Sequence, residues 1–165
     1  MKKIILASLG ILATATPAFA GSGNQSTATG TATATIVAPI VLTHPASASL
    51  NFGRFTTGTG GTVTVSAAGA GSVGSDVTFV PGSTNSADSF TVAGDASRSF
   101  SITTTGGNVT SGSTNLAFTT TPSAATGTLS GTGAASFTVG GTLTVTGTAP
   151  AGSYTGTYSA TVTYN

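Results

Sequence analysis

YTGTYSATVTY, residues 154–164, is the stretch that decides the fold of this chain. Its aromatic, aliphatic and small side chains occupy every even position, and threonine or serine occupies every odd position. In an extended strand, alternate side chains lie on opposite faces. The stretch therefore predicts a β-strand with one buried face and one wet face.

The same alternation recurs outward from this stretch, in short segments separated by glycine, proline, asparagine or aspartate. These segments are ASLNF (48–52), GTVTVSA (61–67), DVTFV (76–80), DSFTVAG (88–94), RSFSITT (98–104), NLAFTTT (115–121), ASFTV (135–139) and GTLTVTG (141–147). We expect about nine or ten short strands and no helix. Short antiparallel strands joined by glycine-rich turns are typical of a sandwich or barrel with Greek-key connections. The predicted fold class is all-β.

The first twenty residues read as a signal peptide. Lys2 and Lys3 precede an apolar run over residues 4–13, and Ala18 and Ala20 form an A-x-A cleavage site. We expect a signal peptide over residues 1–20, a mature chain that begins at Gly21, and no membrane span in that chain. The protein is then exported through the inner membrane to the periplasm or beyond.

Composition excludes several classes of function. Charged residues make up 4% of the chain and cysteine is absent. The mature chain keeps Arg54 and Arg98 against three aspartates, which gives no electrostatic surface for nucleic acid or an anionic membrane. Without disulfides, the exported domain depends on sheet hydrogen bonds and an apolar core, or on partners.

In the N-terminal part of the mature chain, small or apolar residues occupy every even position from Ala28 to Leu42. Threonine occupies every odd position from Thr27 to Thr35. Fully extended, this run reaches about 50 Å, whereas a domain of this length has a radius of gyration of about 14 Å. We therefore expect residues 21–35 to be an extension that belongs to another sheet, and residues 36–165 to be the sandwich domain. Residues 36–42 are apolar on both faces, which predicts a buried strand.

Three features together resemble the pilins of the chaperone–usher pathway. They are LNFG at residues 50–53, the alternating N-terminal extension, and a C-terminal strand in which Gly152 precedes a near-terminal aromatic, Tyr164. The likeness is greatest to the spore-coat-U-like branch and to the secreted "domain of unknown function 4402" family. It implies an immunoglobulin-like antiparallel β-sandwich that lacks one strand, which a neighbouring subunit supplies by donor-strand exchange.

The resemblance also implies a function: a structural subunit of a bacterial pilus or fimbria, with copies of itself, a periplasmic chaperone and an outer-membrane usher as partners. The chain would pass through the periplasm to an extracellular fibre. The donor strand would present Ala28, Gly30, Ala32, Ala34 and Ile36 to the next subunit. The C-terminal strand would contact the chaperone or the next subunit through Gly152, Tyr154, Tyr158, Val162 and Tyr164.

A self-complete secreted sandwich is the alternative. In that case the long first strand folds onto its own sheet, the C-terminal tyrosines fill the core, and the protein is an adhesive or surface-coat component.

The sequence offers little for catalysis or metal binding. His44 is the only histidine, and no GxSxG nucleophile elbow occurs. We expect Asp76, Asp88 and Asp95 to be turn residues whose carboxylates cap backbone N–H groups. We therefore expect no enzyme activity, no cofactor and no metal.

Overall fold

A computed structural model describes residues 23–25 and 27–165 of the chain. The expected signal peptide, residues 1–20, lies outside the described residues. The chain divides between Thr35 and Ile36 into two units. In the first unit, residues 27–35 are exposed and form no strand. Nowhere in the described part does a helix reach the length and apolar character needed to cross a bilayer.

The second unit consists of strands and the turns between them. The strands are β1 (Val41–Thr43), β2 (Phe55–Thr56), β3 (Gly60–Val65), β4 (Gly71–Ser75), β5 (Thr78–Phe79), β6 (Asp88–Ala93), β7 (Ser99–Thr104), β8 (Gly107–Ser111), β9 (Thr114–Pro122), β10 (Thr126–Thr128), β11 (Ala134–Thr146), β12 (Thr155–Gly156) and β13 (Ala160–Tyr164). The strand pairs are antiparallel. The fold is an all-β antiparallel sandwich, as the alternation predicts.

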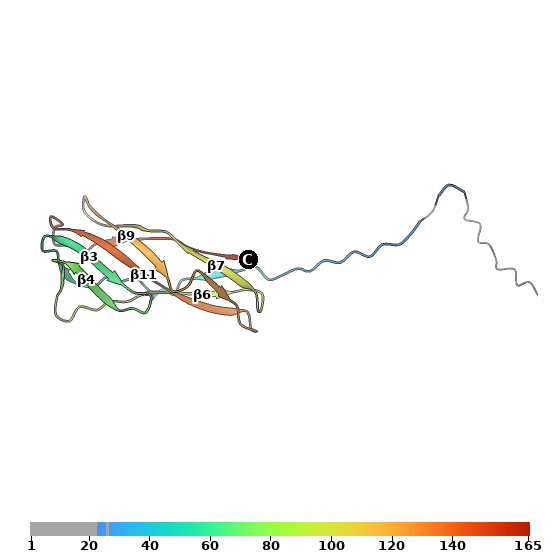
Figure 1. Ribbon diagram of the computed structural model, residues 1–165, viewed down its shortest axis with the longest axis horizontal. Coiled ribbons are helices and arrows are strands. Elements are labelled where there is room, and N and C mark those ends of the chain that lie inside the picture. Colours follow the sequence, from blue (N-terminus) through green and yellow to red (C-terminus); the bar gives the residue numbers. More distant parts are fainter. Residues whose placement is uncertain (1–22, 26) are drawn as a thin grey trace, which may run out of the picture. The chain divides into compact units, whose positions relative to one another are not determined.

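Strand β11 organises the largest sheet, whose order is β1-β6-β11-β9-β8-β12, with β3 paired to β11 and to β4. The first half of β11 pairs with β6, and its second half pairs with β3 on one side and β9 on the other. A three-stranded sheet, β10-β7-β13, and a small pair, β2-β5, complete the sandwich. Figure 1 shows β3 and β4 at one end of this unit, and β6, β7 and the C-terminus at the other.

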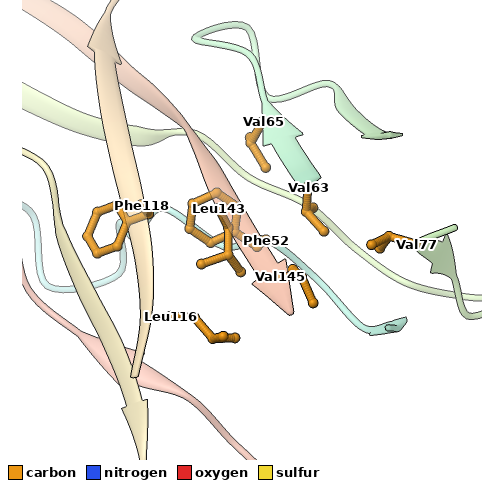
Figure 2. Packing of buried hydrophobic residues seen from close by; sticks show 8 residues of the cluster. All are labelled: Phe52, Val63, Val65, Val77, Leu116, Phe118, Leu143 and Val145. Atoms are coloured by element: carbon orange, nitrogen blue, oxygen red, sulfur yellow. The ribbon is translucent and has the colours of Figure 1, made fainter. Parts of the chain in front are cut away.

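The core consists of two apolar clusters, one toward each end of β11. The first contains Phe52, Val63, Val65, Val77, Leu116, Phe118, Leu143 and Val145, and Figure 2 shows these side chains directed toward one another from β3, β9, β11 and the neighbouring segments. The second contains Phe90, Val92, Phe100, Ile102, Leu129, Phe137 and Val139. Each fully buried side chain of this size contributes about 1.5–3 kcal/mol, so the two clusters supply much of the driving force for folding.

Two segments expected to be separate strands form one. ASFTV and the first six residues of GTLTVTG (141–146) both belong to β11, which runs without interruption through Gly140 and Gly141. A Cβ at Gly140 would lie 2.6 Å from the backbone N of Ala67, and one at Gly141 would lie 2.5 Å from the carbonyl O of Thr119. These glycines are therefore not turn residues: they allow neighbouring backbones to approach inside a strand.

The strand expected over residues 36–42 is shorter than predicted. Only Val41–Thr43 forms β1, and the side chain of Ile36 is 97% exposed. Ile40 and Leu42 pack against the second cluster. Pro39 supplies no N–H to a ladder, which is consistent with a strand that begins only after it.

The C-terminal stretch is also divided. β12 pairs with β8 in the large sheet, whereas β13 pairs with β7 in the three-stranded sheet. Residues 157–159 carry the chain from one sheet to the other. The uniform alternation of this stretch therefore spans both layers of the sandwich.

Candidate functional site

A groove runs between the N-terminal and C-terminal segments of the sandwich domain. Its volume is about 1110 Å³. One wall is formed by His44 and residues 49–57, and the other by residues 149–158. The floor consists of Asp88, Phe90, Val109, Leu116, Phe118, Leu143 and Val145. We call this cavity the terminal groove.

The strands of both terminal segments are paired on one side. On the N-terminal side, β1 pairs with β6 and β2 pairs with β5. On the C-terminal side, β12 pairs with β8 and β13 pairs with β7. Within residues 36–165, none of these four strands has a second partner strand. Their free edges have backbone N–H and C=O groups available to another strand.

Aromatic side chains join the two core clusters at the groove floor. The ring of Tyr158 packs edge-on against Phe90, with centroids 6.3 Å apart, and against Phe118 at 6.2 Å. Tyr158 packs against both clusters. Edge-to-face pairs of this kind add about 0.5–1.5 kcal/mol to the burial of each ring. The floor is therefore a continuous, largely apolar surface.

One polar cluster interrupts that surface. Asp88, only 3% exposed, accepts hydrogen bonds from His44 Nε2 at 2.7 Å, from the Tyr158 hydroxyl at 2.7 Å and from the Ser89 backbone N–H at 2.8 Å. The centroid of the His44 ring also lies 4.9 Å from the centroid of the Phe90 ring. Burial, followed by the hydrogen bond and charge of Asp88, raises the pKa of Tyr158 well above its usual value. We call the side chains of His44, Asp88 and Tyr158 the Asp88 cluster.

The expectation that Asp88 is a turn residue is wrong. It is the first residue of β6, and its side chain lies on the same inward face as Phe90 and Val92. The alternation indicates this direction for the Asp88 side chain, since residues 88, 90 and 92 are alternate residues of one strand and lie on the same face. Asp76 and Asp95 do lie in a turn and a bend. Their carboxylates contact side chains, the Thr59 hydroxyl and the Arg98 guanidinium respectively.

Tyr164 makes a second polar connection, outside the groove. Its hydroxyl accepts a hydrogen bond from the Asp95 N–H at 2.6 Å and donates one to the Ala38 carbonyl at 3.0 Å. The Arg98 guanidinium carbon lies 5.3 Å from the centre of the Tyr164 ring. These contacts hold the last strand to the segment that precedes β1.

The predicted site residues have different surroundings. Gly152, Tyr154 and Tyr158 line the terminal groove, and the Tyr154 hydroxyl donates to the Pro150 carbonyl at 2.9 Å. Tyr154 also packs against the first core cluster, and Tyr158 packs against both. Val162 and Tyr164 pack against the second core cluster and do not line the groove. The five predicted donor residues, Ala28, Gly30, Ala32, Ala34 and Ile36, are exposed and lie in no strand. Sequence reasoning missed His44, Asp88 and the apolar floor as parts of one site.

The groove offers no cluster of metal-ligating side chains. Across residues 23–25 and 27–165, no three His, Cys, Asp or Glu side chains gather closely enough to hold an ion. His44 and Asp88 form only a pair.

Comparison with known proteins places the chain in a family. No curated protein and no solved structure matches it significantly. A family model described as "Domain of unknown function (DUF4402)" matches residues 42–164, a range that begins within β1, ends at the last residue of β13 and includes both walls and the floor of the terminal groove. The chain therefore belongs to the DUF4402 family.

Proposed function

We propose that this protein is the structural subunit of a bacterial surface fibre, a pilus or fimbria, in which residues 24–36 of one copy insert as a strand into the terminal groove of the next. The observation that carries the proposal is the groove itself. It is lined by β2 on one wall and β12 on the other, has an apolar floor, and is lined by residues that pack in both clusters of the core. Addition of a strand to exposed sheet edges is a common mode of peptide recognition.

The dimensions of the groove suit a peptide strand. Small-molecule sites usually measure about 300–1,000 Å³, and the terminal groove is larger, at about 1110 Å³. Its C-terminal wall runs from Ala149 to Tyr158, a length of at most about 30 Å at 3.3 Å for each step between successive residues. Residues 27–36 of the extension have the same number of residues and would reach the same length when extended.

The extension has the chemistry of an inserted strand. Residues 27–39 are exposed and form no strand, and no charged residue occurs among residues 21–40. Each main-chain hydrogen bond to a groove wall would contribute about 0.5–1.5 kcal/mol net. Roughly ten such bonds, together with the burial of Ile36, would make dissociation slow, so the stability of the fibre would be kinetic.

The proposal gives the protein a structural rather than a catalytic role. His44 and Asp88 form a pair that could polarise a nucleophile, but the third side chain in the cluster is Tyr158. The raised pKa of its phenol favours the neutral form. The Asp88 cluster is therefore better suited to binding a strand than to attacking a substrate.

Export and assembly follow from the same proposal. The segment over residues 1–20 would direct the chain through the inner membrane. An open apolar groove and free strand edges favour aggregation, so a periplasmic chaperone would cover them until an outer-membrane usher exchanges the chaperone for the next subunit. The final location is then an extracellular fibre.

The test removes residues 24–35 and supplies the missing strand as a peptide. The remaining domain keeps all the described strands and both core clusters. A peptide of residues 24–36, NQSTATGTATATI, should raise its unfolding temperature. At a concentration of 100 times Kd the gain is about 2.7 kcal/mol, or roughly 5–11 °C.

Two variant peptides provide the controls. Ala32→Asp places a charge on the even parity, which would face the apolar floor, and should abolish the gain. Thr31→Asp places the same charge on the opposite face and should leave most of it. If the truncated domain is a stable monomer whose melting no peptide changes, the proposal fails and a self-complete adhesive or coat protein replaces it.

A further inference from the structure

The terminal groove is chemically asymmetric. Most of its floor is apolar, from Val109 to Val145, but at one point it contains a buried carboxylate, Asp88. That point is where the two walls are linked, because His44 belongs to the N-terminal wall and Tyr158 to the C-terminal wall. A strand in the groove therefore passes over an apolar surface and reaches a polar group at one end.

The Asp88 carboxylate has room for one more hydrogen bond. An ionised carboxylate offers about four acceptor positions. Oδ1 accepts from His44 Nε2 and from the Ser89 N–H, and Oδ2 accepts from the Tyr158 hydroxyl. Because Asp88 also lines the groove, a donor on an inserted strand could occupy the remaining position on Oδ2. A buried charge favours such a donor and disfavours an alkyl side chain in the same place.

The N-terminal extension is asymmetric in the matching sense. The side chains at its even positions would face the groove floor. They are Ser26 at one end, the small residues from Ala28 to Ala34 in the middle, and Ile36 at the other end. Ser26 lies outside the described residues, so only its place in the sequence is relevant. From Ser26 to Ile36 an extended strand spans about 33 Å. The groove wall from Tyr158 to Ala149, of which residues 155–156 form a strand, measures at most about 30 Å on the same basis.

We propose that Asp88 fixes the register of the inserted strand by accepting a hydrogen bond from the Ser26 hydroxyl of a second copy, while Ile36 of that copy fills the apolar end of the groove. This inference rests on the proposed function. It makes the inserted strand antiparallel to the C-terminal wall and places Thr27 of one copy opposite Thr157 of the other. The uniform Ala and Thr repeat of the extension cannot select this register by itself, because a slip of two residues leaves nearly the same side chains on each face.

The absence of cysteine makes a direct test possible. One full-length copy carries Thr157→Cys, and a second carries one cysteine at Thr27, Thr29 or Thr31. The copies are mixed, allowed to assemble and oxidised, and the disulfide-linked heterodimer is measured on non-reducing gels. We expect Thr27→Cys to cross-link about tenfold more than Thr29→Cys or Thr31→Cys, since a hydrogen bond to a buried charge is worth at least one factor of ten in the equilibrium constant.

The same scan is repeated with Ser26→Ala in the donor copy, which leaves the groove unchanged, and with Asp88→Asn in the acceptor copy. In the Ser26→Ala series the preference for Thr27 should fall to about twofold or less. A preference for Thr27 that survives Ser26→Ala, or a maximum at another position in the unmodified pair, would overturn the role of Asp88 while leaving strand insertion intact. Cross-linking at none of the three positions would overturn this register as well, and the peptide experiment above then decides whether any insertion takes place.

Discussion

Replacing Tyr158 by Phe tests the energetic role of the Asp88 cluster. The substitution keeps the ring contacts with Phe90 and Phe118 and removes only the hydroxyl that donates to Asp88 at 2.7 Å. A hydrogen bond to a charged group contributes about 1.5–3 kcal/mol, and Asp88 is 3% exposed, so water cannot easily replace the lost donor. We expect the free energy of unfolding to fall by this amount.

Tyr154→Phe is the matched control. It removes a hydroxyl from the same wall, but that hydroxyl donates to a neutral carbonyl, that of Pro150, at 2.9 Å in an exposed environment. The expected loss is about 0.5–1.5 kcal/mol. With a urea m-value of about 2 kcal/mol/M, the midpoint should fall by about 0.8–1.5 M for Tyr158→Phe and by about 0.3–0.8 M for Tyr154→Phe.

Equilibrium unfolding in urea measures both variants in the full chain. In the Asp88→Asn background the loss caused by Tyr158→Phe should shrink, because the charged acceptor is gone. The reasoning is refuted if Tyr154→Phe destabilises the protein as much as Tyr158→Phe, or if the effect of Tyr158→Phe is the same with and without Asp88→Asn.

Three further outcomes are expected. A tyrosine in an unfolded chain titrates near pH 10, whereas burial and Asp88 raise the pKa of Tyr158 in the folded state. The contribution of Tyr158 to the free energy of unfolding should therefore be fully present below about pH 10 and decrease above it. Over the same pH range, the urea midpoint of the Tyr158→Phe variant should fall less than that of the unmodified protein. Gly127→Ala should destabilise the domain by about 1–3 kcal/mol, because its Cβ would lie 2.6 Å from the Phe100 ring. Gly131→Ala, whose Cβ meets nothing within 4 Å, should be nearly neutral when both variants are compared by thermal unfolding. The intact mass of the exported protein should match a chain that begins at Gly21, and a mass that includes Lys2 and Lys3 would contradict the expected cleavage site.

Parity predicted much of the fold but not the continuity of the strands. Phe90, Val92, Phe100 and Ile102 are buried on the faces that the alternation assigns. The prediction of strand ends failed mainly at glycine. The pair at residues 140 and 141 suggests a break between two strands, but both residues lie inside β11. A glycine has the same local signature in a turn and in a strand where two backbones approach closely. Only the neighbouring chain distinguishes the two cases.

Three residues that the pilin resemblance assigns to an interface, Gly152, Tyr154 and Tyr158, line the terminal groove. Their role in an interface stays a prediction. His44 and Asp88 share the inward parity of their neighbours, so their direction could have been predicted from the pattern. Their hydrogen bond could not, because it joins residues 44 positions apart, and a period along one strand carries no information about which strand lies opposite it.

The sequence by itself determined the secondary structure class and the two-faced character of the strands, because both follow from where successive side chains point on an extended backbone. It also determined that the chain would have few charges and no disulfides. Only the tertiary structure decided that β1 and β13 each pair on a single side, that a groove of about 1110 Å³ separates the two terminal segments, and that a buried carboxylate lies on its floor. These features depend on the packing of segments distant in sequence, which is set by the whole core rather than by any local pattern.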